Sequence, residues 1–351
     1  MMAGIRERLE AFWSWEKPDR IPFTIYQNEW RHTAEDPGWQ PLFQRGLGVT
    51  WWVPTYKMIL SGVDSSQERY VQDGRPMLRR VLSTPLGKVS ATWLTGQKTD
   101  DWPVKYYLET ARDYRVMEYV VAHTELVPGY QHYLDFERSL PGYAAVLVDA
   151  GYSPIQKIVL DWAGLERFSE HLFECPSEVE ALYQALKRQF IRMCEIIADG
   201  PGRFVDVLES FSADMLGPPR SQEYLFSLYD ECFPMIRQSG KQIGCHFDGK
   251  TAACKEMIRK SPFDLLESLT PPPEGDLTLG EARLAWPDKL IWANINVSSY
   301  NLPAPQLHDR VIELASQAAP DGRGLGFEIS EQYPFNWKES IPVILDALEE
   351  Y

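Results

Sequence analysis

The sequence has few cysteines, a shortage of positive charge and no long apolar run, and each of these features excludes a class of protein. The 351 residues include five cysteines, spread out and without a CxxC pair, so we expect no disulfide framework and a reducing, cytoplasmic location. Lys and Arg number 35 against 50 Asp and Glu, and the net charge of −15 argues against nucleic acid or an anionic membrane as the partner. No stretch approaches the ~18 apolar residues of a membrane span. Charged residues between Arg6 and Lys17 likewise predict that there is no signal peptide.

What the sequence does have is a regular alternation of strand and helix patterns. Hydrophobic residues make up 44% of the chain, enough for a substantial core. A helix at 4–15 precedes a first strand at 21–26, and residues 77–94 read as a β-hairpin around Thr84–Lys88. Further strands are expected at 144–148, 204–208, 242–246, 264–267, 290–294 and 324–329. The helices between and after them are expected at 177–199, 221–239, 250–260, 276–285, 305–318 and 337–349. Ser177 is expected to cap the first of these helices, and Pro234 to kink or shorten the second.

This alternation predicts a parallel sheet. One more strand before residue 144 would complete eight strand–helix units, which predicts a (β/α)₈ TIM barrel with an N-terminal extension and a hairpin insertion. We expect a single domain over residues 1–351. A Rossmann sheet is the weaker alternative, because no glycine-rich phosphate fingerprint follows the first strand.

Polar side chains follow five successive predicted strands. In a TIM barrel the carboxyl ends of the strands meet at one mouth, where active sites lie. The candidate site residues are Glu209, Asp214, His246, Asp248, Glu267, Asn294, Asn296 and Glu328. Several of them also have a structural explanation. Glu209 and Asp214 could be loop or capping residues, and the asparagines could bind loop backbone. Glu328 could pair with an arginine such as Arg323.

His246 and Asp248 form the most informative pair. They end an apolar strand, point to the same face by strand alternation and are followed by Gly249. Such a pair either handles protons and positions substrate, or binds Zn²⁺ or another divalent metal with Glu328 or Glu331 as a third ligand. Cys245 points to the opposite face and is expected in the core.

An aromatic-rich segment precedes the regular part of the chain. Its members could wall a substrate pocket, cage a methylammonium cation, or simply pack a lid or a dimer contact. They are Trp30, Trp39, Trp51, Trp52 and Tyr56.

Several short motifs, in order along nearly the whole chain, carry a family resemblance. They are Arg6-Glu7-Arg8-Leu9 with Lys17 to Pro22, Thr84-Pro85-Leu86-Gly87, Asp214 with the Pro234 helix, and Cys245-His246-Phe247-Asp248-Gly249. In these the chain resembles the uroporphyrinogen decarboxylase superfamily, which includes cobalamin-dependent methyltransferases. The resemblance implies a TIM barrel, a cytoplasmic location and a homodimer.

Two departures from the family pattern narrow what the resemblance implies. The decarboxylases carry an Arg-Gln-Ala-Gly-Arg segment after the first strand, where this chain has Tyr26 to Arg31 without the paired arginines. The zinc methyltransferases use His-x-Cys, where Asp248 replaces the cysteine.

The resemblance therefore favours a methyltransferase that moves a methyl group between a corrinoid (cobalamin), carried by a partner protein, and a small acceptor such as tetrahydrofolate or a thiol. His246, Asp248 and Glu209 would be catalytic, and Glu267, Asn294, Asn296 and Asp214 would bind substrate. His246, Asp248 and Glu328 would hold a metal if one is present. A decarboxylase or other lyase acting on a non-porphyrin small acid is the alternative, and a non-catalytic binding module is the third hypothesis.

Overall fold

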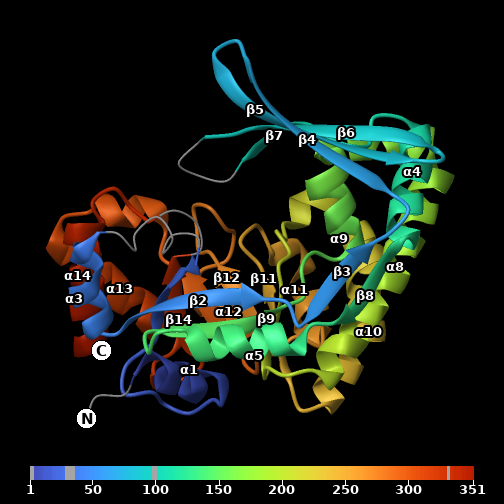
Figure 1. Cartoon of the computed structure of the whole chain (residues 1–351). Coiled ribbons are helices and arrows are strands. Elements are labelled where there is room, and N and C mark those ends of the chain that lie inside the picture. Colours follow the sequence, from blue (N-terminus) through green and yellow to red (C-terminus); the bar gives the residue numbers. More distant parts are fainter. Residues whose placement is uncertain (1–3, 28–35, 97–100, 330–332) are drawn as a thin grey trace. The chain divides into compact units, whose positions relative to one another are not determined.

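The computed structural model describes residues 4–27, 36–96, 101–329 and 333–351 (Figure 1). The chain divides into two compact units. The barrel unit comprises Met1–Thr55, Tyr130–Gly151 and Ile197–Tyr351, and the sheet unit comprises Tyr56–Gly129 and Tyr152–Ile196. This division does not test the expectation of a single domain, which stays a prediction. No helix among the described residues has the length and apolar character to cross a membrane.

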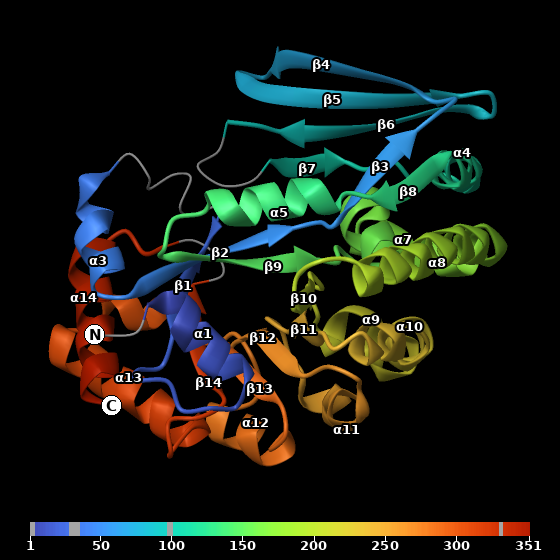
Figure 2. The ribbon, with the colours of Figure 1, turned by 60° about the horizontal axis from the view of Figure 1, so that its bottom comes forward.

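The barrel unit is a closed barrel of eight parallel strands in the order β1-β14-β13-β12-β11-β10-β9-β2. This confirms the predicted TIM barrel. The barrel closes because β1 pairs with both β14 and β2, and β2 pairs with β9, beside which it lies in Figure 2. The strands are β1 Phe23–Tyr26, β2 Leu47–Val53, β9 Ala144–Asp149, β10 Phe204–Val207, β11 Gln242–His246, β12 Leu265–Leu269, β13 Leu290–Asn294 and β14 Leu325–Ile329.

Helices surround these strands and differ from the sequence-based bounds mainly at their ends. The expected helix 221–239 is three segments, because a π-helical turn, Gln222–Phe226, separates α9 from α10. Pro234 lies inside α10, which continues through it to Gln238. The helices of the barrel unit are α1 Ile5–Trp13, α3 Gln40–Gln44, α5 Tyr130–Ser139, α9 Ala213–Ser221, α10 Ser227–Gln238, α11 Lys255–Lys260, α12 Leu279–Ala285, α13 Ala304–Ala318 and α14 Trp337–Glu350.

The eighth strand, β2, is the one that the sequence analysis expected before residue 144 but did not locate. All seven of its residues are buried, so it lacks the alternation that marks a half-exposed strand. It contains Trp51 and Trp52, which the sequence analysis grouped with an aromatic segment. Trp52 joins the core cluster inside the barrel, whereas Trp51 packs on Phe136 of α5 with ring centroids 5.1 Å apart.

The other members of that aromatic segment do not join them. Trp39 stacks on Trp337 of α14 with ring centroids 4.0 Å apart, and Tyr56 starts a strand of the sheet unit. Trp30 lies outside the described residues. The expected aromatic cluster is therefore dispersed. Strand alternation sends Trp51 and Trp52 to opposite faces of β2, and Trp39 and Tyr56 belong to other elements.

Helix α1 closes the end of the barrel where the strands begin. Its backbone at Trp13 accepts a hydrogen bond from Gln242, the first residue of β11, over 2.8 Å. Gly48 permits this approach, since a Cβ there would lie 2.4 Å from Ile5. The apolar layer built between α1 and the strands comprises Ile5, Leu9, Phe12, Trp13, Leu147, Phe204, Leu265, Leu290 and Trp292. The interior is thus packed and dry at this end, which leaves the opposite end for polar side chains.

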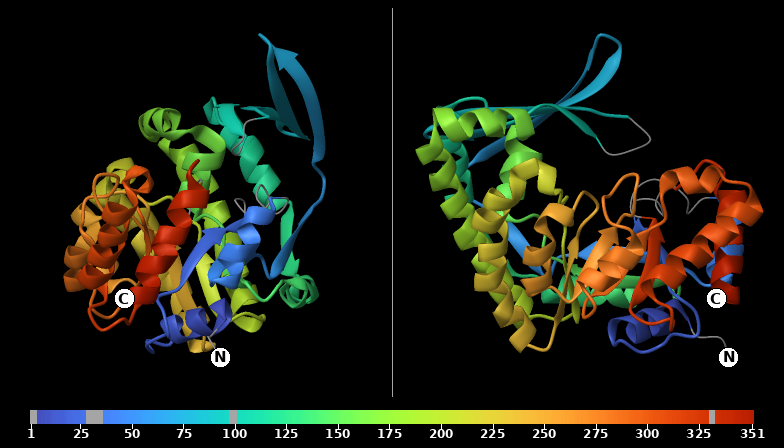
Figure 3. Two further views of the ribbon diagram at one scale, coloured as in Figure 1. Left: turned by 90° about the vertical axis from the view of Figure 1, so that its left-hand side faces the viewer. Right: turned by 180° about the vertical axis from the view of Figure 1, so that it is seen from behind.

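The sheet unit holds two antiparallel sheets and its own helices. β4 Asp64–Gln72, β5 Arg75–Thr84, β6 Gly87–Leu94 and β7 Trp102–Lys105 form one sheet, and β3 Tyr56–Leu60 pairs with β8 Thr124–Pro128 in the other. The pairing of Thr84 with Gly87 confirms the predicted hairpin, and neither of its strands belongs to the barrel. Figure 3 shows β4 and β5 as a long two-stranded ribbon.

The helical segments of this unit are α4 Ala111–Ala122, α6 Pro154–Gln156, the π-helical Lys157–Ala163, α7 Leu165–Glu174 and most of α8 Pro176–Asp199. The expected capping role of Ser177 is wrong. Helix α8 already begins at Pro176, where the fixed φ of proline suits a first helical position. Ser177 instead donates a hydrogen bond to Glu178 over 2.9 Å.

Candidate active site

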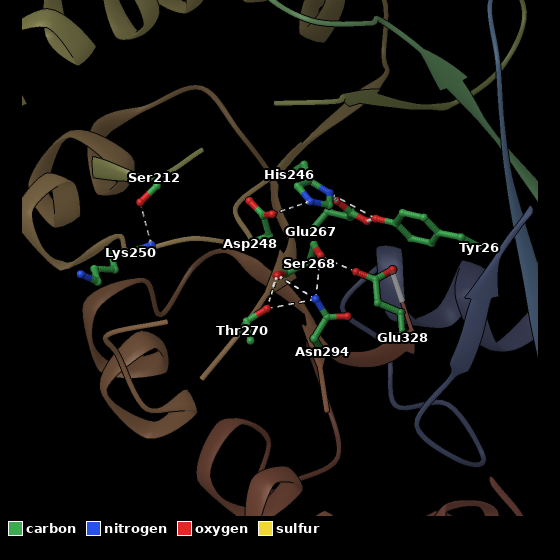
Figure 4. A network of polar contacts seen from close by, with 10 residues as sticks. All are labelled: Tyr26, Ser212, His246, Asp248, Lys250, Glu267, Ser268, Thr270, Asn294 and Glu328. Atoms are coloured by element: carbon green, nitrogen blue, oxygen red, sulfur yellow. Dashed lines mark hydrogen bonds and ion pairs between the residues drawn. The ribbon is translucent and has the colours of Figure 1, made fainter. Parts of the chain in front are cut away.

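A layer of polar side chains crosses the barrel at the end where the strands finish (Figure 4). We call it the acid layer. Three of its carboxyl groups are fully buried, and its histidine is only 8% exposed. Its members are Tyr26 of β1, Asp206 of β10, His246 of β11, Glu267 of β12 and Glu328 of β14.

Glu267 is the centre of this layer. Its Oε2 accepts a hydrogen bond from Nδ1 of His246 over 2.7 Å, and its Oε1 accepts one from the Tyr26 hydroxyl. The same hydroxyl lies 3.2 Å from Nδ1 of His246. Because Glu267 holds the Nδ1 proton, the other ring nitrogen, Nε2, is the one that can exchange a proton. Nε2 faces Asp248, whose Oδ2 lies 3.6 Å away.

A β-bulge in β12 links Glu267 to the neighbouring strands. The register between β12 and β13 shifts between Leu266 and Leu269, and Ser268 adopts a positive φ of 58°. A non-glycine residue with a left-handed backbone is uncommon and often marks a functional site. Here it turns the Ser268 N–H toward Glu328, whose Oε1 accepts the hydrogen bond over 2.8 Å. The Ser268 hydroxyl accepts from Asn294 over 2.8 Å.

The burial of these groups controls their protonation. Burial raises the pKa of Glu328 well above its usual range, and the nearby Glu267 raises it further. Burial and Glu267 raise the pKa of Asp206 in the same way. Burial alone would lower the pKa of His246, but the Glu267 carboxylate and Asp248 outweigh it and raise that pKa well above 6.5. Burial therefore shifts Glu328 and Asp206 toward their protonated forms, while Glu267 and Asp248 shift His246 toward the imidazolium.

Two neighbours, Trp52 and Gly244, hold Asp206 in its place at the base of the layer. Its Oδ2 accepts a hydrogen bond from the indole Nε1 of Trp52 over 2.7 Å, while its buried Oδ1 has no hydrogen-bond partner among the described residues. Gly244 of β11 leaves the room for this carboxyl, since a Cβ there would lie 2.7 Å from Oδ1. Trp52 and Gly244 thus belong to the site even though neither carries a charge.

The structure brings five of the predicted site residues into one polar network and places three elsewhere. His246, Asp248, Glu267, Asn294 and Glu328 lie together at the mouth (Figure 4).

The other three have partners of their own. Glu209 accepts from the Tyr229 hydroxyl of α10 over 2.8 Å, and Asp214 pairs with Lys250 over 2.7 Å on an exposed surface. Asn296 donates to the carbonyl of Pro271 over 2.8 Å and to Glu274. Their assignment to catalysis or substrate binding stays a prediction.

Sequence reasoning missed Tyr26, Asp206 and Ser268, and it named Trp52 only as one of several aromatic residues that could wall a pocket. Tyr26 ends the first predicted strand, so the same strand-end rule could have found it. Asp206 left a stronger signal, because a lone acid inside the buried run Phe204–Val207 needs a partner or a function. Ser268 left no signal, since no local sequence pattern predicts the bulge in β12. Cys245 is buried, as expected.

A metal at His246, Asp248 and Glu328 was the sequence-based alternative for this site. Glu328 lies at the Ser268 backbone and beside Glu267. In the described ranges, no three His, Cys, Asp or Glu side chains gather as metal ligands would. Glu331 lies outside those ranges. A metal at this site stays a prediction.

Comparisons with known proteins identify the fold. No protein-family model matches the sequence, and no curated protein matches it. A methyltransferase from Methanosarcina mazei has a similar structure, with 12% identity, 99% of this chain and 98% of that chain covered, and a TM-score of 0.58. A B12-independent methionine synthase from Shewanella sp. W3-18-1 matches at 12% identity over 91% of this chain and 86% of its own, with a TM-score of 0.45. The chain therefore folds over its whole length as the M. mazei methyltransferase does, which confirms the fold that the family resemblance implied.

Proposed function

We propose that this protein is a methyltransferase whose barrel mouth holds a small methyl donor or acceptor against the Nε2 atom of His246. The observation that carries the proposal is the buried contact of 2.7 Å between Glu267 and Nδ1 of His246. It fixes the tautomer and charge of the imidazole and directs its exchangeable proton toward the mouth. The whole-length fold likeness to a methyltransferase supports the choice of reaction.

Methyl transfer requires control of one proton at the small molecule. When a methyl group leaves a nitrogen, the N–C bond breaks, its electron pair stays on the nitrogen and a proton must replace the methyl group. The Nε2–H of the His246 imidazolium supplies that proton, and Glu267 keeps the ring in place through Nδ1. In the reverse direction Nε2 accepts the proton of an amine or thiol while that atom gains the methyl group. Both directions are general acid–base steps at a positioned side chain.

The methyl acceptor that we propose is tetrahydrofolate or a thiol, and the methyl carrier a corrinoid on a partner protein. A corrinoid, when bound, supplies a cobalt centre that gives or takes the methyl group. The protein's own share is the acid layer, Asn294 and Asp248, whose carboxyl and amide groups suit the ring N–H groups of a pterin. Homodimer formation and a cytoplasmic location belong to the same proposal.

A decarboxylase or lyase acting on a small acid is the weaker candidate. Such an enzyme needs a cationic clamp for the substrate carboxylate. The described mouth offers three buried carboxyl groups around one imidazolium, and Lys250 nearby already pairs with Asp214. A carboxylate substrate would therefore compete with Glu267 for the His246 imidazolium, because Glu267 already contacts its Nδ1 over 2.7 Å.

The test measures transfer of labelled methyl groups from methylcobalamin to tetrahydrofolate or to 2-mercaptoethanol, with purified wild-type protein. His246→Gln should lower kcat by roughly 10²- to 10⁴-fold, the range that a lost acid–base group produces. His308→Gln is the matched control, because His308 is a surface histidine that pairs with the exposed Glu350 over 3.1 Å. It should retain the wild-type rate.

Two results would overturn the proposal. One is wild-type kcat in His246→Gln, which would remove the imidazole from the chemistry. The other is the absence of methyl transfer in wild type combined with turnover of a porphyrinogen or another acid, which would move the assignment to the lyase alternative.

A further inference from the structure

The sheet unit carries a cavity whose lining residues all belong to this unit and have no role in the proposed function. It has a volume of about 740 Å³, and its lining residues lie on or beside the strands of the sheet β4-β5-β6-β7. Figure 2 shows the four strands of this sheet. The opposite face buries Leu78, Val89 and Ala91, and α4 packs against β5 and β6. Strand alternation therefore assigns one face to the core and the other to the cavity.

The register of the strands arranges the cavity face in two rows. One row places Tyr70 beside Met77 and Met77 beside Leu94, which gives an apolar floor with a phenol at its edge. The next row places Arg79 beside Thr92 and Thr92 beside Lys105. Cationic and hydroxyl groups thus run alongside an apolar strip.

The arginines of this face are free to bind a ligand. Arg75 and Arg79 both line the cavity, and neither forms an ion pair with any residue in the described part of the chain. Glu68 stands opposite Arg79 in the register without bonding to it, and Asp73 lies at the rim. Lys105 is already held by Glu109 over 2.9 Å.

The charge of this sheet also contrasts with that of the protein. The side chains that line the cavity include three cations, Arg75, Arg79 and Lys105, and one acid, Asp73, in a chain with a net charge of −15. A local cationic face on an acidic protein attracts anions that the rest of the surface repels.

We propose that this face binds an organic anion with an apolar body, namely a carboxylate or phosphate monoester on a hydrocarbon chain. The guanidinium groups of Arg79 and Arg75 hold the oxyanion, for which their planar fork is suited. The hydrocarbon lies on Met77 and Leu94, and the Tyr70 and Thr92 hydroxyls complete the polar edge. The cavity volume falls within the roughly 300–1,000 Å³ of small-molecule sites.

The experiment titrates the wild-type protein with octyl phosphate and with octanoate by calorimetry, with neutral octyl glucoside as a comparison. Saturable binding of at least one octyl anion, tighter than that of octyl glucoside, is expected, and the tighter of the two anions identifies the preferred head group. Arg79→Gln should weaken this binding about tenfold, as the loss of a charge-assisted hydrogen-bonded pair does. Arg79→Lys should restore part of it, since the charge returns without the planar fork.

Arg69→Gln is the matched control. Arg69 is an exposed arginine of β4 that alternation places on the opposite face, opposite Leu78. It should bind both octyl anions as the wild type does. The proposal is overturned if neither anion saturates the wild type, if octyl glucoside binds as tightly as the anions, or if Arg79→Gln and Arg69→Gln weaken binding equally.

Discussion

Replacing Glu267 by glutamine tests the centre of the acid layer directly. The substitution keeps the shape of the side chain and removes the carboxylate that accepts from Nδ1 of His246 over 2.7 Å. That carboxylate is the main group that raises the pKa of His246 against the opposing effect of burial. We therefore expect the pKa of His246 to fall in Glu267→Gln, because burial is then less opposed.

The energetic cost follows from the burial of both partners. Removing one member of a buried ion pair costs about 3–5 kcal/mol when the other must stay charged. His246 can escape part of this cost by losing its proton, so at neutral pH we expect a loss of about 1.5–3 kcal/mol, the value of a hydrogen bond to a charged group.

The cost should also depend on pH. Since folding raises the pKa of His246, the stability that this pair contributes is fully present below the unfolded pKa of about 6.5 and is lost as pH rises through the folded pKa. The penalty of Glu267→Gln should therefore be larger at pH 6 than at pH 9.

The assay is urea unfolding followed by tryptophan fluorescence at both pH values, together with an NMR titration of the His246 ring nitrogens. Glu350→Gln is the control, because Glu350 also contacts a histidine, His308, but at the surface. It should leave the His246 titration as in wild type. A penalty for Glu267→Gln that is equal at both pH values, or an unchanged His246 titration, would refute the reasoning.

Two further predictions concern the base of the acid layer. Burial and Glu267 raise the pKa of Asp206, so its contribution to stability falls as pH rises from its usual 3.8 through the folded value. Asp206→Asn should therefore lose less stability than wild type as the pH rises from about 4 to about 9 in urea titrations, and a steeper loss would contradict the assignment. Gly244→Ala should cost about 1–3 kcal/mol of unfolding free energy by overpacking, since the new Cβ would meet Asp206 at 2.7 Å. In Gly280→Ala the nearest atom would lie at 3.7 Å and the residue is helical, so a gain of about 0.5–1 kcal/mol is expected. Equal losses in both glycine variants would refute the argument from space.

The local pattern of the sequence was sufficient to predict the barrel and to place five polar residues at its mouth. Each predicted strand was an apolar run between turn signals, and polar residues followed it. Strand alternation alone placed His246 and Asp248 on one face, and the structure puts them 3.6 Å apart. The barrel rule then placed Glu267, Asn294 and Glu328 at the same mouth. These inferences succeeded because they depend on periodicity within a strand and on the common direction of parallel strands.

The tertiary structure alone decided which of those residues touch. Tyr26 reaches His246 across 220 positions of sequence only because β1 closes the barrel against β14 and β2. β2 itself was hidden, since a strand buried on both faces has no alternation to read. Glu209, two residues beyond the strand Phe204–Val207 that contains Asp206, bonds to Tyr229 of α10, whereas Asp206 joins the acid layer. The bulge at Ser268 joins β12 to Glu328 of β14 through a register shift. Register and closure are set by the packing of all eight strands at once, and no single stretch of the sequence contains that information.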